Sequence, residues 1–401
     1  MTEINKNGEQ SHKGKRKFCF PEKSPAILIR KQINDPKLYL WLFVFVYVAT
    51  GNKSMKYIIL AGILISVLQA GAQTKPDFFP EDVTSGGNVN GLRCYCQPGI
   101  RNNSRSKGLE LYYGYFGGGV YKAQDTMLTS PLTEFRNHNH LKASLKAPVL
   151  NKDNLKVLLT FSYSSEVFDI KRFGPDFNNI FHELNDADLK NSTLGIVIAK
   201  PLDEIHYLAF RFRLASNGNY NGLGRYFEDR YAIYKFYGIY AVKPSEDLEW
   251  GIGLAYSKSF RRNNLVPFLV YNRNLNNKWG IEAVLPANAF LRYNLGHGDI
   301  LLLGAEYDSQ SYRLLIPTPG NGHGTGVADF AMNHSEFLLS ARAEHKFAEW
   351  IWGNFKFGYR MNFSTNFEAK SPGTVPFNVD PSNSFFFQIG FFLSPPDHLR
   401  E

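Results

Sequence analysis

Two groups of residues have the types and spacing that catalysis or ligand binding could use. The Gly-rich stretch Gly320–Gly326 could cradle a phosphate, but a phosphate loop leads into a helix N-terminus, and no helical pattern follows here. His138 and His140 would share one face of a strand and could bind a metal, although no third ligand is in view. We interpret the first as an outer loop and the second as histidines near the rim of a sheet.

The common catalytic signatures are not evident in this sequence. No G-x-S-x-G nucleophile elbow occurs, and no Ser/His/Asp set or carboxylate pair stands out. Cys94 and Cys96 are too closely spaced for an ordinary structural disulfide, and no set of His and Cys accompanies them for zinc. We expect no catalytic residue, no metal site and no cofactor, and a protein that is not an enzyme.

A third group consists of charged residues that alternate with apolar ones. Arg211, for example, stands between Phe210 and Phe212. Because successive side chains of a strand leave opposite faces, such charges would share one face of a sheet. They would either line a path for a polar solute or pair across strands and fill the interior. The set comprises Arg211, Arg213, Glu282, Arg292, Glu306, Arg342, Glu344, Lys356 and Arg360.

The alternation also predicts the elements that position these charges. In residues 247–307, apolar and polar side chains alternate over segments that short polar stretches separate, such as 274–277. A period of two indicates β-strands, and the short stretches indicate hairpin turns. The pattern runs from Gly108 nearly to the C-terminus. Clear apolar rows are Leu109, Leu111, Tyr113 and Tyr115; Trp250, Ile252, Leu254 and Tyr256; and Phe385, Phe387, Ile389, Phe391 and Leu393.

Two all-β architectures alternate in this way. A soluble sandwich turns its apolar face inward, whereas a transmembrane barrel turns it toward lipid. The strands run about 10 residues, as a tilted membrane crossing requires, rather than about 5 or 6. Aromatic residues make up 15% of the chain and cluster at strand ends, as interfacial girdles do. We therefore expect an antiparallel transmembrane β-barrel.

The connections between the strands alternate in length. Residues 151–154, 200–204 and 243–247 form short connections, and the stretches between them are long. An outer-membrane barrel has short periplasmic turns and long outer loops. Carried along the chain, this alternation predicts about 14 strands, in a range of 12 to 14, with both ends in the periplasm. One long outer loop, 168–184, is rich in aromatic and Asn residues.

One hairpin carries a more detailed expectation. The stretch 285–288 must be a tight outer hairpin, since the proline at its second position cannot donate in mid-strand. A turn centred near Ala287 would place Glu282 opposite Arg292, close enough for an ion pair. Glu306, on the following strand, would join this pair through Arg292.

The beginning of the chain differs from the rest. Residues 1–54 hold ten Lys/Arg and four Asp/Glu. Residues 55–72 then have a Lys, a short apolar run and Ala70-Gly71-Ala72, the layout of a secretory signal peptide. Residues 1–54 are either translated sequence upstream of a true start at Met55, which we favour, or a cytoplasmic segment with an anchor. We expect an irregular periplasmic lead-in at 73–105, the barrel at 106–394 and a tail at 395–401.

The charge balance and the export signal limit which partners are expected. Counted from Gln73, the chain has 34 basic and 32 acidic residues, so nothing in it favours nucleic acid. We expect the protein in the cell outer membrane, with outer-membrane lipid and the barrel-assembly machinery as partners, and a small polar solute as a further one.

Several stretches resemble a known family. WGIGLAYSKSF, VPFLVYNRNLNNKWGIEAVLPANAFLRYN and GHGDILLLGAEYDSQSYRL are similar to an uncharacterised family of outer-membrane β-barrel proteins found mainly in Bacteroidota. The features that match are Pro267 in a strand, the 277–279 turn, Leu285-Pro286 and Arg292-Tyr293. The resemblance covers 247–315 best and implies an outer-membrane barrel, but it implies no catalytic or ligand residue.

The sequence therefore favours a pore or transport channel for a small solute. The alternative is a structural or surface-binding, adhesin-like barrel that uses its long outer loops, and an outer-membrane hydrolase is a more remote reading. The charged inward rows suit the first, and the loops suit the second.

Overall fold

The structure is a computed structural model that describes residues 98–123, 133–172, 178–260, 263–296, 298–318, 326–370 and 376–395. The expected start and signal peptide, Cys94 and Cys96, and residues 320–325 of the Gly-rich stretch lie outside these residues. The described residues all belong to one compact unit, Ala70–Glu401.

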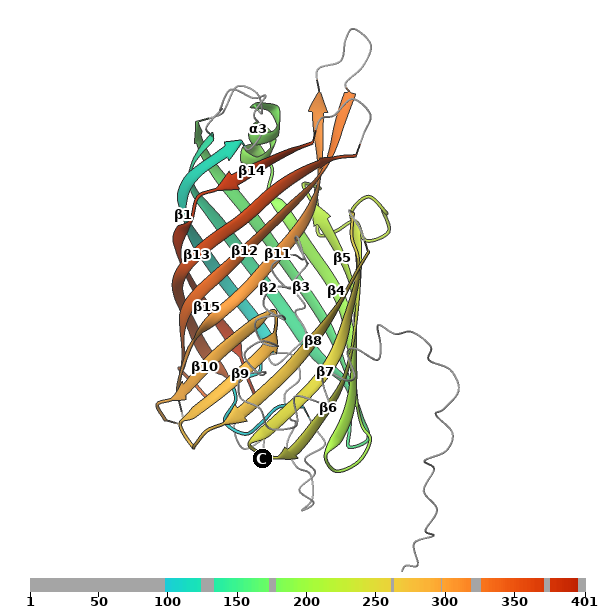
Figure 1. Cartoon of the computed structure of the whole chain (residues 1–401), viewed down its shortest axis with the longest axis vertical. Coiled ribbons are helices and arrows are strands. Elements are labelled where there is room, and N and C mark those ends of the chain that lie inside the picture. Colours follow the sequence, from blue (N-terminus) through green and yellow to red (C-terminus); the bar gives the residue numbers. More distant parts are fainter. Residues whose placement is uncertain are drawn as a thin grey trace, which may run out of the picture. The chain divides into compact units, whose positions relative to one another are not determined.

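The alternating sequence forms a closed antiparallel ring of strands (Figure 1). β1 (Leu109–Ala123) to β13 lie side by side in chain order, and β15 (Ser384–Leu393) pairs with both β13 and β1. The described sheet has 15 strands, and 14 of them make the ring, because β14 (Phe377–Pro381) only extends it between β13 and β1. This confirms the predicted antiparallel transmembrane β-barrel. The other strands are β2 (Thr133–Lys152), β3 (Leu155–Arg172), β4 (Leu189–Pro201), β5 (His206–Gly218), β6 (Ala232–Ser245), β7 (Leu248–Lys258), β8 (Asn263–Asn274), β9 (Trp279–Leu285), β10 (Asn288–Asn294), β11 (Asp299–Thr318), β12 (Gly326–Lys346) and β13 (Ile351–Ala369).

Side chains alternate between the outside of the ring and its interior. On β15, Phe385 and Phe387 are 62% and 40% exposed, whereas Phe386 between them is 1% exposed. The outward rows are apolar on strand after strand, which is the surface that a bilayer requires. The row that ends at Leu393 thus faces lipid, as the sequence predicts.

The two ends of the ring differ. Short turns join the strands at the end where β1 begins, which we call the inner end, and α3 (Asn178–Asp186) lies at the opposite, outer end (Figure 1). Several strands run past the expected 10 residues toward the outer end: β11 has 20 and β12 has 21. Among the described residues, no helix is long and apolar enough to span a membrane.

The outer end is filled by an apolar group that we call the outer cluster. It joins α3 to the outer parts of β1–β4 and β11–β14. Residues 168–184, expected as an exposed loop, instead hold the end of β3 and most of α3, and their apolar side chains Phe168, Phe181 and Leu184 are buried. The segment is not an exposed loop, because its apolar side chains face the barrel interior and pack in the outer cluster. The outer cluster comprises Tyr121, Phe135, Phe168, Ile170, Ile180, Phe181, Leu184, Leu189, Tyr312, Leu314, Ile316, Phe330, Met332, Phe367, Phe377 and Val379.

The facing of β15 gives the first testable prediction. Phe387→Arg would place a cation in lipid and should lower the free energy of unfolding by about 2–4 kcal/mol. Gln388→Arg, one residue on, faces the interior, where water solvates it, and should cost less than about 1 kcal/mol despite Lys356 opposite. Unfolding of both variants in bilayers measures the difference, and equal losses would contradict the assigned facing.

Candidate functional site

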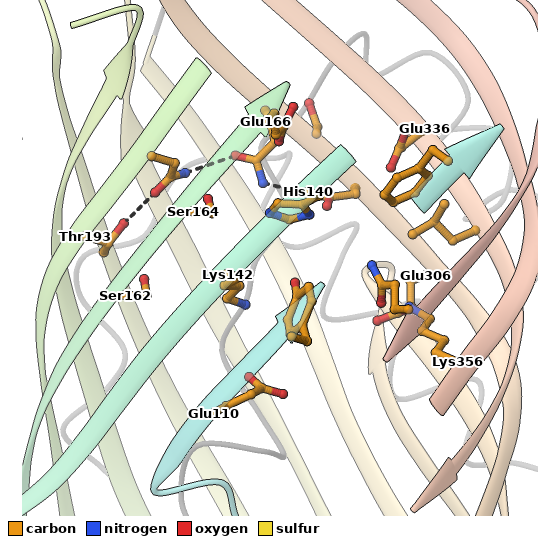
Figure 2. Close-up of a pocket in the computed structure, with 18 of the residues that line it drawn as sticks. Glu110, His140, Lys142, Ser162, Ser164, Glu166, Thr193, Glu306, Glu336 and Lys356 are labelled. Atoms are coloured by element: carbon orange, nitrogen blue, oxygen red, sulfur yellow. Dashed lines mark hydrogen bonds and ion pairs between the residues drawn. The ribbon is translucent and has the colours of Figure 1, made fainter. Parts of the chain in front are cut away.

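A polar cavity of about 180 Å³ lies in the middle of the ring (Figure 2). Its lining comes from strands on all sides of the interior, including β1–β6 and β11–β13. Hydroxyl and amide groups such as those of Ser162, Ser164 and Thr193 alternate with charges of both signs. A cavity of this size with several polar groups is suited to water or a small polar molecule.

Glu306 is the centre of a charged group in this cavity. Lys356 Nζ contacts Glu306 Oε2, and Arg342 Nη2 lies 3.7 Å from Glu306 Oε1. Figure 2 shows Glu306 and Lys356 pointing toward each other from adjoining parts of the wall. The positive charges are also held by rings, since Lys356 lies 5.5 Å from the ring centre of Phe386 and Arg342 lies 5.3 Å from that of Phe290.

His138 marks the boundary between the cavity and the outer cluster. Its ring stacks on Phe116 and Phe168, with centroid distances of 5.1 and 4.3 Å. Its Nδ1 accepts a hydrogen bond from Arg360 Nη1 at 3.2 Å, so the proton of a neutral His138 lies on Nε2. That nitrogen is 3.3 Å from Glu166 Oε2. His138 therefore orients a carboxylate at the outer limit of the cavity.

His140 does not join His138 in a metal site. It lines the cavity and meets the ring of Tyr112 edge-on at 5.6 Å. Within the part of the chain that the structure describes, no group of three or more His, Cys, Asp or Glu is placed to hold a metal ion. Both histidines lie inside the barrel rather than at its rim, so the sequence placed them on the right strand but at the wrong position.

A chain of polar side chains connects opposite parts of the wall. Thr193 Oγ1 donates to Asn191 Oδ1 at 3.0 Å, and Asn191 Nδ2 donates to Gln310 Oε1 at 3.4 Å (Figure 2). Gln310 Nε2 then donates to Asp308 Oδ1 at 3.3 Å. β4 and β11 are far apart in the ring order, so the interior is narrow here.

Residues 98–107, which we call the inner segment, close the inner end of the interior. The N–H of Gly99 donates to Glu249 Oε1 at 2.8 Å, and the N–H of Ser104 donates to Glu282 Oε1 at 2.8 Å. Ser104 Oγ also donates to Glu282 Oε2 at 2.5 Å. The segment has no regular secondary structure, so carboxylates of the wall satisfy backbone groups that a strand would pair with a neighbour.

The inner segment is also held by charged and aromatic contacts. Arg101 Nε lies 2.6 Å from Asp247 Oδ1, and this hydrogen bond and charge raise the pKa of Arg101 above its ordinary value. Arg105 lies 4.7 Å from the ring centre of Trp352. Apart from the buried side chain of Ile100, the segment is thus held by polar and cationic contacts, in contrast to the outer cluster.

The Glu282–Arg292 pair forms, but not in the expected register. Arg292 Nε lies 3.0 Å from Glu282 Oε1, and both side chains are buried. In the ladder, however, Glu282 lies opposite Phe290 and Arg292 lies opposite Gly280. Asn288 lies opposite Val284, so the turn is centred on Pro286, one residue earlier than predicted, and the pair is diagonal.

Glu306 does not join Arg292, contrary to expectation. Glu306 lies opposite Asn288, four residues from Arg292 along β10. That separation is about 13 Å at a rise of about 3.3 Å per residue. Glu306 instead pairs with Lys356 and Arg342 across β11–β13.

The predicted interior residues fall into separate groups. All nine are on inward-facing positions of the ring, and all but Arg213 are buried. Arg213, Glu306, Arg342 and Lys356 line the cavity, and Arg360 lies at its outer boundary. Glu282 and Arg292 lie at the inner segment, Glu344 lies 3.7 Å from Lys107 of that segment, and Arg211 is buried on β5 outside the cavity lining.

Sequence reasoning missed two features of the interior. Residues 98–105 read as a periplasmic lead-in because they show no periodicity, yet they lie inside the ring. Glu249 was seen only as one member of a polar row. It accepts hydrogen bonds from Tyr207 Oη and Asn272 Nδ2, both at 2.7 Å, which makes it a buried anchor for the inner segment. The sequence feature that could have indicated this role is a carboxylate directly before the outward apolar row that begins at Trp250.

The ring, its apolar exterior and its polar interior define a transmembrane β-barrel with a central cavity. Comparisons with known proteins add the following. No family model and no curated protein matches this chain, so the family resemblance remains an expectation from the sequence. Several solved structures are similar to this chain at low identity. An outer-membrane channel from Pseudomonas putida F1 is 12% identical over 73% of this chain and 98% of its own, with a TM-score of 0.35.

Two further solved structures are similar in the same limited way. The translocator domain of the autotransporter NalP from Neisseria meningitidis is 11% identical over 73% of this chain and 90% of its own, with a TM-score of 0.27. The P. putida toluene transporter TodX is 6% identical over 72% of this chain and 90% of its own, with a TM-score of 0.29. At these scores the comparisons assign no role to any residue.

The space opposite Arg292 gives a second prediction. A Cβ at Gly280 would overlap the guanidinium of Arg292, so Gly280→Ala should displace this buried side chain and cost about 1–3 kcal/mol. Gly296→Ala is the matched control, because nothing lies within 4 Å of a Cβ there. Chemical unfolding of the two variants measures the difference, and equal stability would show that the Arg292 site has room to spare.

The Glu282–Arg292 pair gives a third prediction. Arg292→Ala leaves Glu282 without its cation in a buried site and should destabilise the barrel by about 3–5 kcal/mol. Adding Glu282→Gln removes the stranded charge, so the double variant should recover much of the loss. A double variant no more stable than Arg292→Ala would mean that the guanidinium acts through packing alone.

Proposed function

We propose that this protein is an outer-membrane channel that passes a small polar solute through the central cavity, and that the structure represents its closed state. The observation that carries the proposal is a polar cavity between two closures of different composition. An interior that served structure alone would be filled by the paired charges, as at Glu282–Arg292. Around Glu306 the charges instead border open space.

The inner segment supplies the removable closure. It is tied to the wall by hydrogen bonds and ion pairs that water can replace, such as those of Ser104 and Arg101. Each such bond contributes only about 1 kcal/mol net, because it replaces bonds that the same groups would make to water. The outer cluster, in contrast, is apolar and would expose its surface to water on opening.

Location and export follow from the same proposal. A closed barrel with an apolar exterior suits the outer membrane, and the signal layout at 55–72 would deliver the chain to the barrel-assembly machinery. In this proposal translation starts at Met55, and the mature protein begins at Gln73.

A surface-binding role is the second candidate, and one observation favours it. β11 and β12 stay paired as far as Thr318 and Gly326, so this hairpin continues beyond the outer cluster (Figure 1). Shortening the hairpin would abolish binding to cells if this were the role and would leave the conductance of the barrel unchanged.

Conductance in planar bilayers tests the channel. Arg101→Ala combined with Ser104→Ala removes the ion pair to Asp247 and the bond from Ser104 Oγ to Glu282, while the backbone bond of Ser104 and the wall stay intact. A loss of about 2 kcal/mol from the closed state corresponds to a rise of roughly 30-fold in the ratio of open to closed. The fraction of time spent open should rise accordingly.

Lys278→Ala is the control for this experiment, because Lys278 is exposed in an inner turn and takes no part in the bonds that hold Arg101 and Ser104. It should conduct like the unaltered protein. Absence of conductance from the double variant, with the barrel correctly folded, would reject the channel and favour the surface-binding role.

A further inference from the structure

The connection between β5 and β6, residues 219–231, exposes two large apolar side chains, and we call it the β5–β6 loop. Phe227 is 96% exposed, the largest value for an apolar side chain in the described part of the protein, and Leu223 is 69% exposed. An apolar ring surrounded by water is unfavourable, since burying it would remove that surface from water. The position of the loop relative to the bilayer therefore decides what Phe227 contacts.

Two serines on the outer surface of the ring locate the loop. Leu194 of β4 and Phe212 of β5 are exposed and face outward. Counted in steps of two toward the outer end, the outward positions lead to Ser192 on β4 and Ser216 on β5, which lie opposite each other. Both serines have 0% exposure, although they are at outward positions. Another part of the chain must therefore cover them.

The β5–β6 loop supplies this cover. Tyr226 Oη and Ser192 Oγ are hydrogen-bonded, and the N–H of Arg225 donates to Ser216 Oγ at 2.8 Å. Tyr220 Oη donates to the C=O of Ser216 at 2.8 Å. These contacts show that the loop folds back over the outside of the ring instead of extending away from its outer end.

The covered serines lie at the outer limit of the apolar exterior. Leu194 lies opposite Leu214, and the two serines form the next outward pair toward the outer end. Nearby, Lys258 Nζ lies 6.0 Å from the ring centre of Tyr234. Tyrosine rings and long cationic side chains at strand ends are typical of the boundary between membrane and water. The loop is thus continuous with the lipid-facing surface, at the height of this boundary.

Hydrogen bonds and an ion pair fix the part of the loop that carries Phe227. Arg225 Nη1 lies 2.6 Å from Glu228 Oε1. The C=O of Glu228 accepts from the N–H groups of Tyr231 and Ala232, at 2.9 and 3.2 Å. A loop that is already ordered loses little conformational entropy when its side chains bind a partner.

The charges of the loop balance. Arg225 and Arg230 are accompanied by Glu228 and Asp229. A segment that binds anionic headgroups by charge has an excess of Lys and Arg. The apolar side chains therefore supply the attraction to a membrane.

We propose that the β5–β6 loop is a membrane anchor that inserts Phe227, together with Leu223, into the outer leaflet where headgroups meet acyl chains. The partner is the lipid surface itself. The anchor goes beyond the proposed channel, because it requires neither a solute nor an open state.

A fluorophore at Phe227 tests the anchor. Phe227→Cys is labelled with NBD in a chain whose Cys19, Cys94 and Cys96 are replaced by Ser, and the barrel is reconstituted in phosphatidylcholine vesicles. Phe236→Cys, on the outward face of β6, is the control in lipid, and Asp153→Cys, exposed in an inner turn, is the control in water.

NBD at position 227 should emit at shorter wavelength than at 153. Lipids with a nitroxide near the headgroup should quench it severalfold more than they quench the label at 153. A nitroxide deep in the acyl chain should quench position 236 more than position 227. Added salt should leave the quenching at 227 unchanged, because an apolar attraction is not screened. Leu223→Cys should give the same pattern and provides a second reading from the loop.

Two results would overturn the anchor. If the label at 227 emitted and was quenched by aqueous iodide like the label at 153, Phe227 would face water, as a surface-binding role requires. Quenching by lipid that disappeared at high salt would mean that charge, not apolar insertion, holds the loop. Neither measurement uses conductance, so a barrel that carries no current would reject the channel and leave the anchor standing.

Discussion

Backbone hydrogen bonding in lipid is the constraint on which this fold depends. A bilayer offers no partner for an unpaired N–H or C=O, so a sheet that crosses it must close on itself. β15 meets this requirement by pairing with β1 over the whole height of the apolar exterior, from Leu393 opposite Leu109 to Phe386 opposite Phe116. Beyond the bond from the N–H of Tyr307 to the C=O of Ala287, side-chain amides bond to the backbone of β11, as Asn217 does at Ser311.

The same constraint leaves the interior free to vary. Outward positions must be apolar because they face lipid. Inward positions need only fit the available space and balance charge, and their residue types differ along the barrel axis. At the outer end they form an apolar core with α3, in the middle they border a polar cavity, and at the inner end they bind an irregular segment. Apolar packing resists displacement by water, whereas hydrogen bonds to Glu249 and Glu282 exchange with it. The barrel is therefore asymmetric in what can open.

The sequence predicts facing well and register poorly, for one physical reason. A period of two assigns each residue to a face, so the lipid-facing row of β15 and the inward charges were both recognisable. A shift of two residues keeps every side chain on its face, so the pattern cannot distinguish Glu282 opposite Arg292 from Glu282 opposite Phe290. The position of residues 98–105 inside the ring was not predicted, because their backbone N–H groups donate to carboxylates of the wall. Such bonds require no periodic sequence pattern. The contact of β5 with β11, at Gly218 and Arg313, was not predicted either. A single bridge and the amides of nearby Asn side chains form it, and neither produces a strand pattern.

The two sequence readings of the inward charges, a solute path and a filled interior, apply to different heights of the same barrel. At the inner end, Arg292 has no exposed surface, and its partner Glu282 accepts hydrogen bonds from Ser104. These charges therefore fill space and hold the inner segment. In the middle, Lys356 and Arg342 are fixed over Phe386 and Phe290, which keeps their positive charges in place while Glu306 borders the cavity. A charge held by a ring and a carboxylate keeps its position when solute or water exchanges beside it, because its own contacts do not have to break. The frame around the cavity thus keeps its place, and in the proposed channel the part that moves is the inner segment.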